Sequence, residues 1–278
     1  MVKYYVGGQA LIEGVMMKYK NKIAIAVRNN NGKITVKKEN LRFKESNIPF
    51  IRGIVNLFII LYIGIKSLGY STNVSLGKED KLGFGEIFLS FVFAIVFGLA
   101  LFKFLPLFLT TMFDRYFTVN NIVFNIIEGL IKVGIFVLYV YSISFMKDVY
   151  RVFQYHGAEH KAVACHESRK KLNVKEVQKF HKEHKRCGTS FIFLVFLLSI
   201  VVYSLIPKDL DFGMKLTLRI ALLPVIASIG YEALRLGARF NILSWLGYPG
   251  LWIQKITTKE PDNKQVEVAI KSIKAVLR

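Results

Sequence analysis

The residues with the greatest capacity for chemistry lie in one short part of the chain. All five histidines fall within 29 residues, and the two cysteines lie inside or just beyond that window. Imidazole nitrogens and thiolate sulfurs are the ligands that Zn²⁺ prefers in proteins. Random placement would seldom gather them so closely, so the concentration predicts a shared site. The set consists of His156, His160, His166, His181, His184, Cys165 and Cys187.

Five consecutive residues in this window form a known motif. The segment from His156 to His160 reads His-Gly-Ala-Glu-His, the inverted zinc-protease pattern His-x-x-Glu-His. On a helix, residues four apart share a face, so both imidazoles can reach one metal ion. In that chemistry Zn²⁺ lowers the pKa of a water molecule, and the Glu of the motif is the general base. We therefore predict His156 and His160 as metal ligands and Glu159 as the catalytic residue.

A catalytic zinc ion usually has three protein ligands, and the sequence offers two carboxylates for the third. Glu232 lies at the end of the last long apolar stretch, which the charge distribution places on the same side of a membrane as His156. An acidic side chain at the edge of a membrane span is a functional candidate. Glu13, set among glycines and apolar residues, is the other candidate, either as a ligand or as the partner of a ligand.

Other interpretations of these residues remain open. A closed structural zinc site would use two thiolates and two imidazoles, from Cys165, His181, His184 and Cys187. Without a metal, the polar residues of the motif would form a network that caps the end of a membrane span. The two histidines nearest Cys187 would then belong to the solvated face of a basic helix, and both thiols would be small buried groups.

Composition assigns the chain to the membrane class. Hydrophobic residues make up 53% of its 278 residues, and the mean hydropathy is +0.38, above that of a water-soluble domain. A formal charge of +20 results from 39 Lys and Arg against 19 Asp and Glu. The basic residues stand in blocks beside apolar stretches, so we expect a bilayer with anionic headgroups as the partner, and no nucleic acid. Two cysteines exclude a disulfide scaffold.

Four apolar stretches have roughly the length that a ~30 Å hydrocarbon core requires. They are Ile87 to Leu109, Ile122 to Phe145, Phe191 to Ile206 and Leu216 to Tyr231. A fifth stretch, Ile54 to Ile65, is only twelve residues long and contains Asn56. We predict an interfacial or re-entrant helix over 54–72 in place of a fifth span.

The connections between these stretches differ in charge. Residues 1–53 and 146–190 each hold eleven Lys and Arg, and 235–278 hold eight, whereas the links 110–121 and 207–214 hold one each. Cytoplasmic loops of membrane proteins carry the excess of Lys and Arg. Four crossings place all three basic regions on one side, so we expect a multi-pass plasma-membrane protein with both termini cytoplasmic.

The segment before the apolar stretches has the pattern of a β-hairpin, with residues 23–27 and 33–38 flanking an Asn-rich turn that ends in Gly32. The expected fold is an α-helical polytopic membrane protein with about four transmembrane helices, an interfacial helix and this small β-hairpin region. Its parts are a cytoplasmic β-rich segment (1–53), the interfacial or re-entrant helix (54–72), two transmembrane helices (86–145), a cytoplasmic loop rich in His, Cys and basic residues (146–190), two more transmembrane helices (191–232) and a cytoplasmic or interfacial C-terminal region (233–278).

Four segments resemble the YqhQ-like family of bacterial multi-pass membrane proteins, and the resemblance runs from residue 7 to about residue 255. The segments are Gly7-Gly-Gln-Ala-Leu-Ile-Glu-Gly-Val-Met-Met17, Tyr155-His-Gly-Ala-Glu-His-Lys161, Arg186-Cys-Gly-Thr-Ser-Phe191 and Gly230-Tyr-Glu-Ala-Leu-Arg235. The resemblance implies a domain of unknown function that is regarded as a metal-dependent enzyme. The positions that it carries over as functional are Glu13, His156, Glu159, His160, Cys187 and Glu232.

The sequence supports one main hypothesis, a membrane-embedded Zn²⁺-dependent hydrolase that acts on peptide or lipid-ester substrates at the cytoplasmic face. Secondary ligand candidates are Cys187, His184 and Cys165. The alternative is a non-enzymatic membrane scaffold or regulator in which the same residues form a polar network between helices. Transport fits less well, because the spans hold few acids, and Glu128 beside Lys132 is explained as an intramembrane pair.

Overall fold

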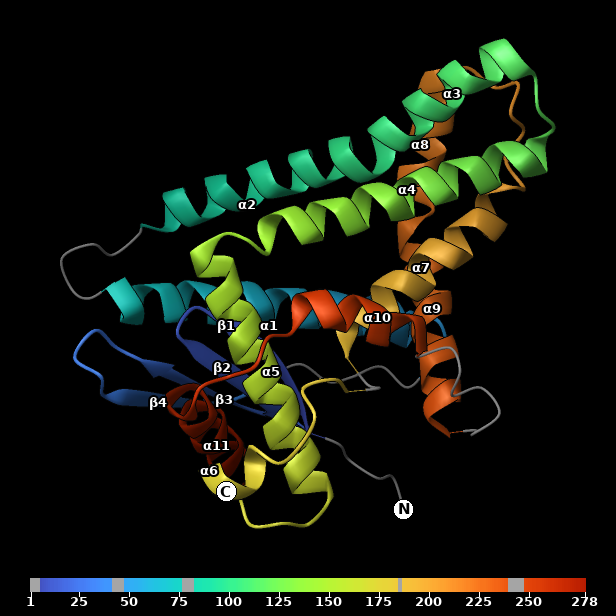
Figure 1. Ribbon diagram of the computed structural model, residues 1–278. Coiled ribbons are helices and arrows are strands. Elements are labelled where there is room, and N and C mark those ends of the chain that lie inside the picture. The colour runs from blue at the N-terminus through green and yellow to red at the C-terminus, as the bar shows by residue number, and fades with distance from the viewer. Residues whose placement is uncertain (1–5, 42–47, 77–82, 185–186, 240–247) are drawn as a thin grey trace.

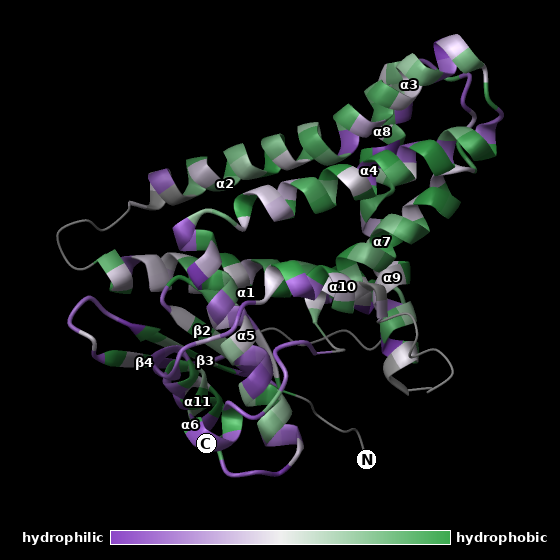
Figure 2. Cartoon of the chain, viewed as in Figure 1, coloured by the Kyte–Doolittle hydropathy of each residue, from purple (hydrophilic) through white to green (hydrophobic). Residues whose placement is uncertain are grey.

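The computed structural model describes residues 6–41, 48–76, 83–184, 187–239 and 248–278. A part built on a small β-sheet lies beside a part built of long helices (Figure 1). Hydrophilic residues are concentrated in the loops around the sheet, whereas the long helices α2 (Phe84–Leu99), α3 (Leu105–Phe117), α4 (Asn121–Ile143) and α7 (Gly188–Tyr203) are mainly hydrophobic (Figure 2). The polar and apolar regions of the sequence therefore separate in space.

The N-terminal region is a four-stranded antiparallel sheet, with neighbouring strands in the order β1-β2-β3-β4. The strands are β1 (Gly7–Leu11), β2 (Gly14–Tyr19), β3 (Lys22–Arg28) and β4 (Ile34–Asn40). The predicted hairpin is confirmed as β3 and β4, and the sheet is larger than predicted because the glycine-rich start of the chain adds two strands. Between β1 and β2, Glu13 adopts a left-handed backbone with φ of 51°, as tight hairpin turns require.

Both faces of the sheet are covered, which explains why β3 is apolar at nearly every position. One face packs against α5 (Lys147–Glu167) and α11 (Asn263–Leu277), and the other packs against α1 (Ile51–Leu76). Alternating residues of β2 and β3 divide between the two cores, with Met17 and Ala24 on the α11 side and Met16 and Ile25 on the α1 side. The C-terminal helix therefore completes a unit that the N-terminal strands begin.

The long helices form the apolar part. They are α2 (Phe84–Leu99), a π-helical turn η1 (Ala100–Phe104), α3 (Leu105–Phe117), α4 (Asn121–Ile143), α7 (Gly188–Tyr203), α8 (Phe212–Ala221) and α9 (Leu223–Arg239). Two shorter helices complete the chain: α6 (Val174–Val177) lies between α5 and α7 in the sequence, and α10 (Tyr248–Thr257) follows α9. Among the described residues, three helices are long and apolar enough to cross a membrane: residues 51–76, 88–117 and 121–143. The bent pair α8 and α9 adds a fourth if it is one span.

The spans differ in detail from the prediction. The stretches that begin at Ile87 and Ile122 form long helices as expected, but the stretch from Phe191 forms the 16-residue α7, and the last stretch is broken between α8 and α9 by a 40° bend. The segment predicted as an interfacial or re-entrant helix over 54–72 belongs to one 26-residue helix, α1. Its polar residue Asn56 did not end the helix, because its amide donates a hydrogen bond to Tyr231 Oη of α9 at 2.8 Å.

Candidate metal centre

The His-x-x-Glu-His motif lies in α5, which is outside the long apolar helices. Tyr155, Ala158 and Ala162 form the stripe of α5 that packs into the core of the sheet. This packing turns His156 and His160 toward a neighbouring side of the helix, where their ring centroids lie 4.4 Å apart. The i, i+4 geometry predicted from the motif is therefore present, and the sheet fixes its direction.

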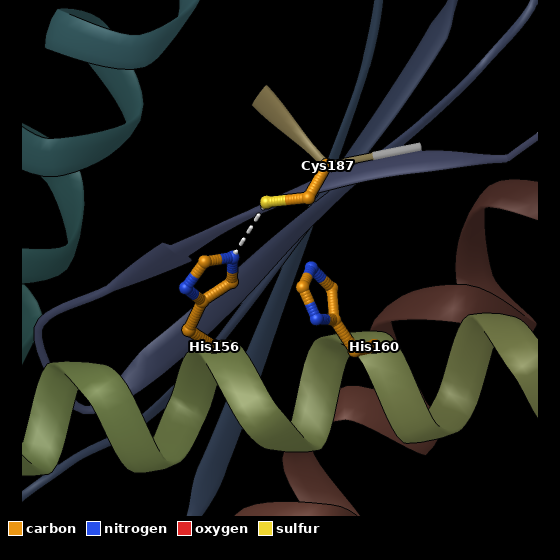
Figure 3. A group of neighbouring side chains, drawn as sticks. All are labelled: His156, His160 and Cys187. Carbon is orange, nitrogen blue, oxygen red and sulfur yellow. Dashed lines mark hydrogen bonds between the residues drawn. The ribbon is translucent and has the colours of Figure 1, made fainter. Parts of the chain in front are cut away.

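A third ligand atom reaches the two imidazoles from the start of α7. Cys187 is the N-cap residue of that helix, and its Sγ lies 3.3 Å from His156 Nε2. One ligand atom from each of His156, His160 and Cys187 lies within 4.8 Å of the others (Figure 3). Three ligands of a tetrahedral Zn²⁺ ion are separated by roughly 3.4–3.8 Å, given bond lengths of about 2.0–2.3 Å. The side chains thus stand close to a metal-binding arrangement.

Backbone carbonyls orient both imidazoles. His156 Nδ1 lies 2.9 Å from the carbonyl oxygen of Thr257, and His160 Nδ1 lies 2.6 Å from that of Lys182. A carbonyl oxygen can only accept, so each Nδ1 must carry a proton, and in a neutral ring Nε2 then presents its lone pair. Hydrogen bonds of this kind from the other ring nitrogen are the usual outer contacts of zinc-bound histidines.

The loop that provides the Lys182 carbonyl is itself held in place. Gln254 of α10 is fully buried, and its side chain makes two hydrogen bonds to the backbone of His184, accepting from N at 2.7 Å and donating to O at 3.0 Å. The sequence analysis missed Gln254, Thr257 and Lys182, because a backbone carbonyl leaves no trace in the sequence. The sequence signal that could have pointed to this contact is a glutamine in the mostly apolar stretch Leu251-Trp-Ile-Gln-Lys-Ile256.

The protonation preferences of these groups follow from their burial. Burial lowers the pKa of His160 well below its ordinary value, so the ring is neutral, which is the form that binds a metal. Burial raises the pKa of the Cys187 thiol, although hydrogen bonds from Thr189 oppose the effect. A metal ion would therefore have to displace the thiol proton on binding.

Glu159 lies next to the three ligands but is not one of the converging group. Its Oε2 is 3.4 Å from His160 Nε2, and the residue is 6% exposed. Burial raises the pKa of this carboxyl to about 8. The strand β1 leaves room for the side chain because residue 8 is glycine: a Cβ there would lie 2.5 Å from Glu159 Oε1. The glycine-rich N-terminal motif and the histidine motif therefore meet in space.

Glu13 is not among the converging ligand atoms, but it supports the helix that carries two of them. Its carboxylate accepts two hydrogen bonds from Arg151, at 2.5 and 2.6 Å, and one from Tyr155 Oη at 3.1 Å. Tyr155 directly precedes His156. These contacts agree with the partner role predicted for Glu13, since its carboxylate touches the helix that carries the histidines and is not in the converging group.

The structure likewise places Glu232 apart from the converging ligand atoms. Its carboxylate forms a two-pronged ion pair with the Arg52 guanidinium and accepts a hydrogen bond from Phe50 N at 3.2 Å. Glu232 thus ties α9 to the start of α1. In the described structure, the ligand-type atom that joins the two imidazoles is the sulfur of Cys187, a secondary candidate in the sequence analysis, and not a carboxylate oxygen.

Among the residues that the structure describes, the four members of the alternative closed site do not form a converging group of ligand atoms. Cys165 lies in the core between α5 and the sheet, where its Sγ contacts the Lys171 carbonyl at 3.6 Å. His184 is closer to the centre, with its ring 5.8 Å from that of His160, and its Nε2 lies 3.3 Å from Glu167 Oε2. Arg186, which belongs to the motif around Cys187, lies outside the described residues.

The comparisons with known proteins agree with the resemblance noted in the sequence. Residues 48–278 match the family described as "Protein of unknown function (DUF1385)". The chain belongs to this family. It is also 36% identical over 294 residues to the uncharacterized protein YqhQ of Bacillus subtilis (strain 168), an alignment that covers 98% of this chain and 92% of that protein. No solved structure matches the chain.

Proposed function

We propose that this DUF1385 chain is a multi-pass membrane protein with a catalytic Zn²⁺ site formed by His156, His160 and Cys187. The observation that carries the proposal is the convergence of three ligand atoms within 4.8 Å, with both histidines already oriented by backbone carbonyls. Two imidazoles and a thiolate suit Zn²⁺ better than the hard cations Mg²⁺ and Ca²⁺, which take oxygen ligands. Three protein ligands leave a fourth position for a substrate or water.

The reaction class that best fits this arrangement is hydrolysis. Zn²⁺ in such a site supplies Lewis acidity and activates water at neutral pH. Glu159 is the candidate base for that water, since its carboxyl lies 3.4 Å from His160 Nε2 without occupying the centre itself. Because burial raises its pKa to about 8, the ionised form that accepts the proton of the water increases as the pH rises toward 8. Gly8 and the backbone of β1 hold that carboxyl on one side. Peptide and lipid-ester bonds are both within reach of this chemistry.

Chain topology supports a site at one face of the membrane. The sheet, α5 and α11 form one packed unit, so they lie on one side of a bilayer. The chain must then cross an even number of times between β4 and α5, although three helices in that interval are long enough to cross. The helix that does not cross is α1, because one side of it packs on the sheet through Ile63 while Phe58 and Leu61 remain exposed.

This placement supports the positive-inside assignment. Between β4 and α5 the chain then crosses twice, first through the continuous helix of α2, η1 and α3 and then through α4. Between α6 and α10 it crosses twice more, first through α7 and then through the bent pair of α8 and α9. In Figure 1, α1 lies on the side of the sheet that faces α2 and α4. The metal centre would stand at the cytoplasmic surface of a plasma membrane, with both termini cytoplasmic and anionic headgroups beside α1.

The first experiment measures metal content of the detergent-purified chain by plasma mass spectrometry. We expect about one equivalent of Zn²⁺ in the wild type, as for other three-ligand sites, and its loss in His156→Ala, His160→Ala and Cys187→Ser. His181→Ala is the matched control, because this histidine is exposed. Glu159→Gln should keep the metal and lower turnover of peptide or lipid-ester substrates by about 10²- to 10⁴-fold.

A second measurement separates a catalytic site from a structural one. After Co²⁺ replaces Zn²⁺, a thiolate ligand gives a charge-transfer band, and acetohydroxamate should shift the visible d–d bands if a coordination position is open. No metal in folded, zinc-supplied protein would overturn the proposal in favour of the scaffold. In that case the 3.3 Å contact between His156 and Cys187 would belong to a metal-free polar network. A spectrum that acetohydroxamate leaves unchanged would exclude hydrolysis and retain a structural zinc.

A further inference from the structure

A second cluster of charged side chains lies among the long helices, apart from the metal centre. Four helical segments contribute to it: Lys103 from η1, Glu128 and Lys132 from α4, Tyr203 from α7, and Arg219 from α8. Lys103 is 7% exposed and each of the other four is 1% exposed. The sequence analysis recognised only Glu128 and Lys132, which are neighbours on one helix. Packing brings two more cations to them.

Positive charge exceeds negative charge in this cluster. Arg219 pairs with Glu128 at 2.6 Å, and its guanidinium also donates to Asn125 Oδ1 at 3.0 Å. Lys132 Nζ lies 3.4 Å from the other oxygen of Glu128. Within the described part of the chain, Glu128 is the one acid that forms an ion pair with any of these three cations, namely with Arg219 and Lys132. The cluster of three cations and one carboxylate thus has a formal charge of +2.

The two lysines also have few hydrogen-bond partners. Each ammonium group has three N–H donors. Among the described residues, Lys103 Nζ donates one hydrogen bond, to Tyr203 Oη at 2.8 Å, and Lys132 Nζ donates one long one, to Ser199 Oγ at 3.4 Å. Both ammonium groups lie 5.0 Å from the centre of the Tyr203 ring. Attraction to an aromatic face offsets little of the cost of burying a full charge.

All three cations gather around the same ring, since the Arg219 guanidinium lies 5.1 Å from the centre of Tyr203. The backbone is adapted to this arrangement at Lys103, which sits in the π-helical turn η1. Turns of this kind are rare and occur frequently at functional sites. Like charges held together in a low-dielectric region repel one another unless an anion lies between or beside them.

We propose that Lys103, Lys132 and Arg219 form a binding site for an oxyanion, the phosphate or carboxylate group of a lipid or of a small solute. This inference rests on the membrane placement proposed above but not on the zinc chemistry. Glu128 is the internal counter-ion with which the ligand competes for Arg219. Lys215, one turn before Arg219 and also buried, donates to the Lys208 carbonyl at 3.0 Å and extends the positive charge toward the link at 207–211.

The test uses the full-length chain in phosphatidylcholine nanodiscs, with two arms. One arm titrates inorganic phosphate and acetate and follows the thermal unfolding midpoint. The other adds phosphatidylglycerol or further phosphatidylcholine and counts retained lipids by native mass spectrometry. Phosphate or acetate binding alone assigns a free anion as the ligand, and selective retention of phosphatidylglycerol assigns a lipid. Either result supports the site.

Three variants make the assignment specific. Lys103→Met should weaken binding of the anion by about tenfold or more, because it removes a charged hydrogen-bond donor. Glu128→Gln should strengthen binding by roughly three- to tenfold, because it removes the competing carboxylate without changing the side-chain shape. Arg115→Gln removes an exposed cation from the last turn of α3 and should bind the anion as the wild type does.

Two outcomes would overturn the proposal: no anion binds the wild type in either arm, or Lys103→Met and Glu128→Gln both bind as the wild type does. The gain expected for Glu128→Gln cannot result from misfolding, so the proposal stays testable if Lys103→Met is unstable. Zinc content should equal that of the wild type in every cluster variant, and His156→Ala should keep the anion affinity. Failure of the metal centre and failure of the anion site are therefore distinguishable.

Discussion

The Cys187 thiol must lose a proton before it can bind Zn²⁺, and its burial makes that loss depend on pH. Burial raises the pKa of this thiol above its ordinary value, whereas His160 is already neutral. Below the thiol pKa, each unit of added pH raises the thiolate fraction tenfold. We expect the Kd for Zn²⁺ to fall about tenfold per pH unit from pH 6.5 to 8.5. Competition with a chromophoric chelator measures it.

That pH titration is best done in Glu159→Gln, because burial raises the pKa of the Glu159 carboxyl to about 8. In the wild type, loss of the Glu159 proton would add to the pH dependence of the Kd for Zn²⁺. Cys187→Ser in the same background should give weaker binding and lose the slope. A Kd that does not change with pH in Glu159→Gln would show that the thiol is not a ligand.

Two adjacent glycines offer a matched pair of substitutions at the same scale. A Cβ at position 8 would lie 2.5 to 2.8 Å from three atoms of the Glu159 side chain, whereas a Cβ at position 7 would meet nothing within 4 Å. Gly8→Ala should destabilise the fold by about 1–3 kcal/mol, because the buried carboxyl must move. Gly7→Ala should change stability by less than about 0.5 kcal/mol. Thermal unfolding in detergent compares them, and equal effects would contradict the predicted contact.

At this scale, the motif predicted the right helix but not the full site. The i, i+4 spacing of His156 and His160 is a local property, so it could be inferred from five residues. The approach of Cys187 depends on how the start of α7 packs against α5, and no spacing rule encodes that. The sequence therefore suggested Glu232 and Glu13, which are acids in unusual places. Both form ion pairs, with Arg52 and Arg151 respectively.

At the scale of elements, the pair formed by Glu232 and Arg52 holds α9 against the first turn of α1. Glu232→Ala should leave zinc content unchanged and lower stability by about 1–3 kcal/mol, because Arg52 would remain largely buried without its partner. Glu39→Gln is the control, since its pair with Lys66 is half exposed and should contribute less than about 1 kcal/mol. Loss of zinc in Glu232→Ala would instead identify that carboxylate as a ligand.

The lengths of the elements were less predictable than their positions. Asn56 interrupted the apolar pattern of α1 in the sequence, yet it contacts Tyr231 of α9. The glycines of α1 also face partners: Gly53 lies against Ser228 of α9 and Gly64 against Gln9 of β1. Small and polar residues permit this close packing, which a scan for apolar runs treats as an interruption. The hairpin of β3 and β4 was predictable because its turn residues are local.

At the scale of the whole molecule, packing constrains topology more tightly than charge does. Ser272 of α11 donates a hydrogen bond to the Ala24 carbonyl of β3 at 2.9 Å, and Arg151 of α5 binds Glu13 in the β1–β2 turn. Under the proposed membrane placement, segments from the start, middle and end of the chain must therefore share one side of the bilayer, whichever way the protein is inserted. The distribution of Lys and Arg predicts the same segments on one side of the membrane, and it further predicts that this side is the cytoplasm.

Site-directed labelling tests this topology. In a Cys165→Ala, Cys187→Ser background, a single cysteine is introduced by Lys33→Cys, Lys170→Cys or Lys274→Cys. Each of these cysteines should react with a membrane-impermeant maleimide only after cells are opened. Cysteines at Tyr116 and Asp209, in the two weakly charged links, should react in intact cells. A cysteine at Phe58 in α1 should resist the reagent in both preparations, because the exposed apolar side of α1 would lie in the membrane interface. If Lys33 and Lys170 reacted on opposite sides, α1 would be a span, and the sheet could not pack against α5 as it does here.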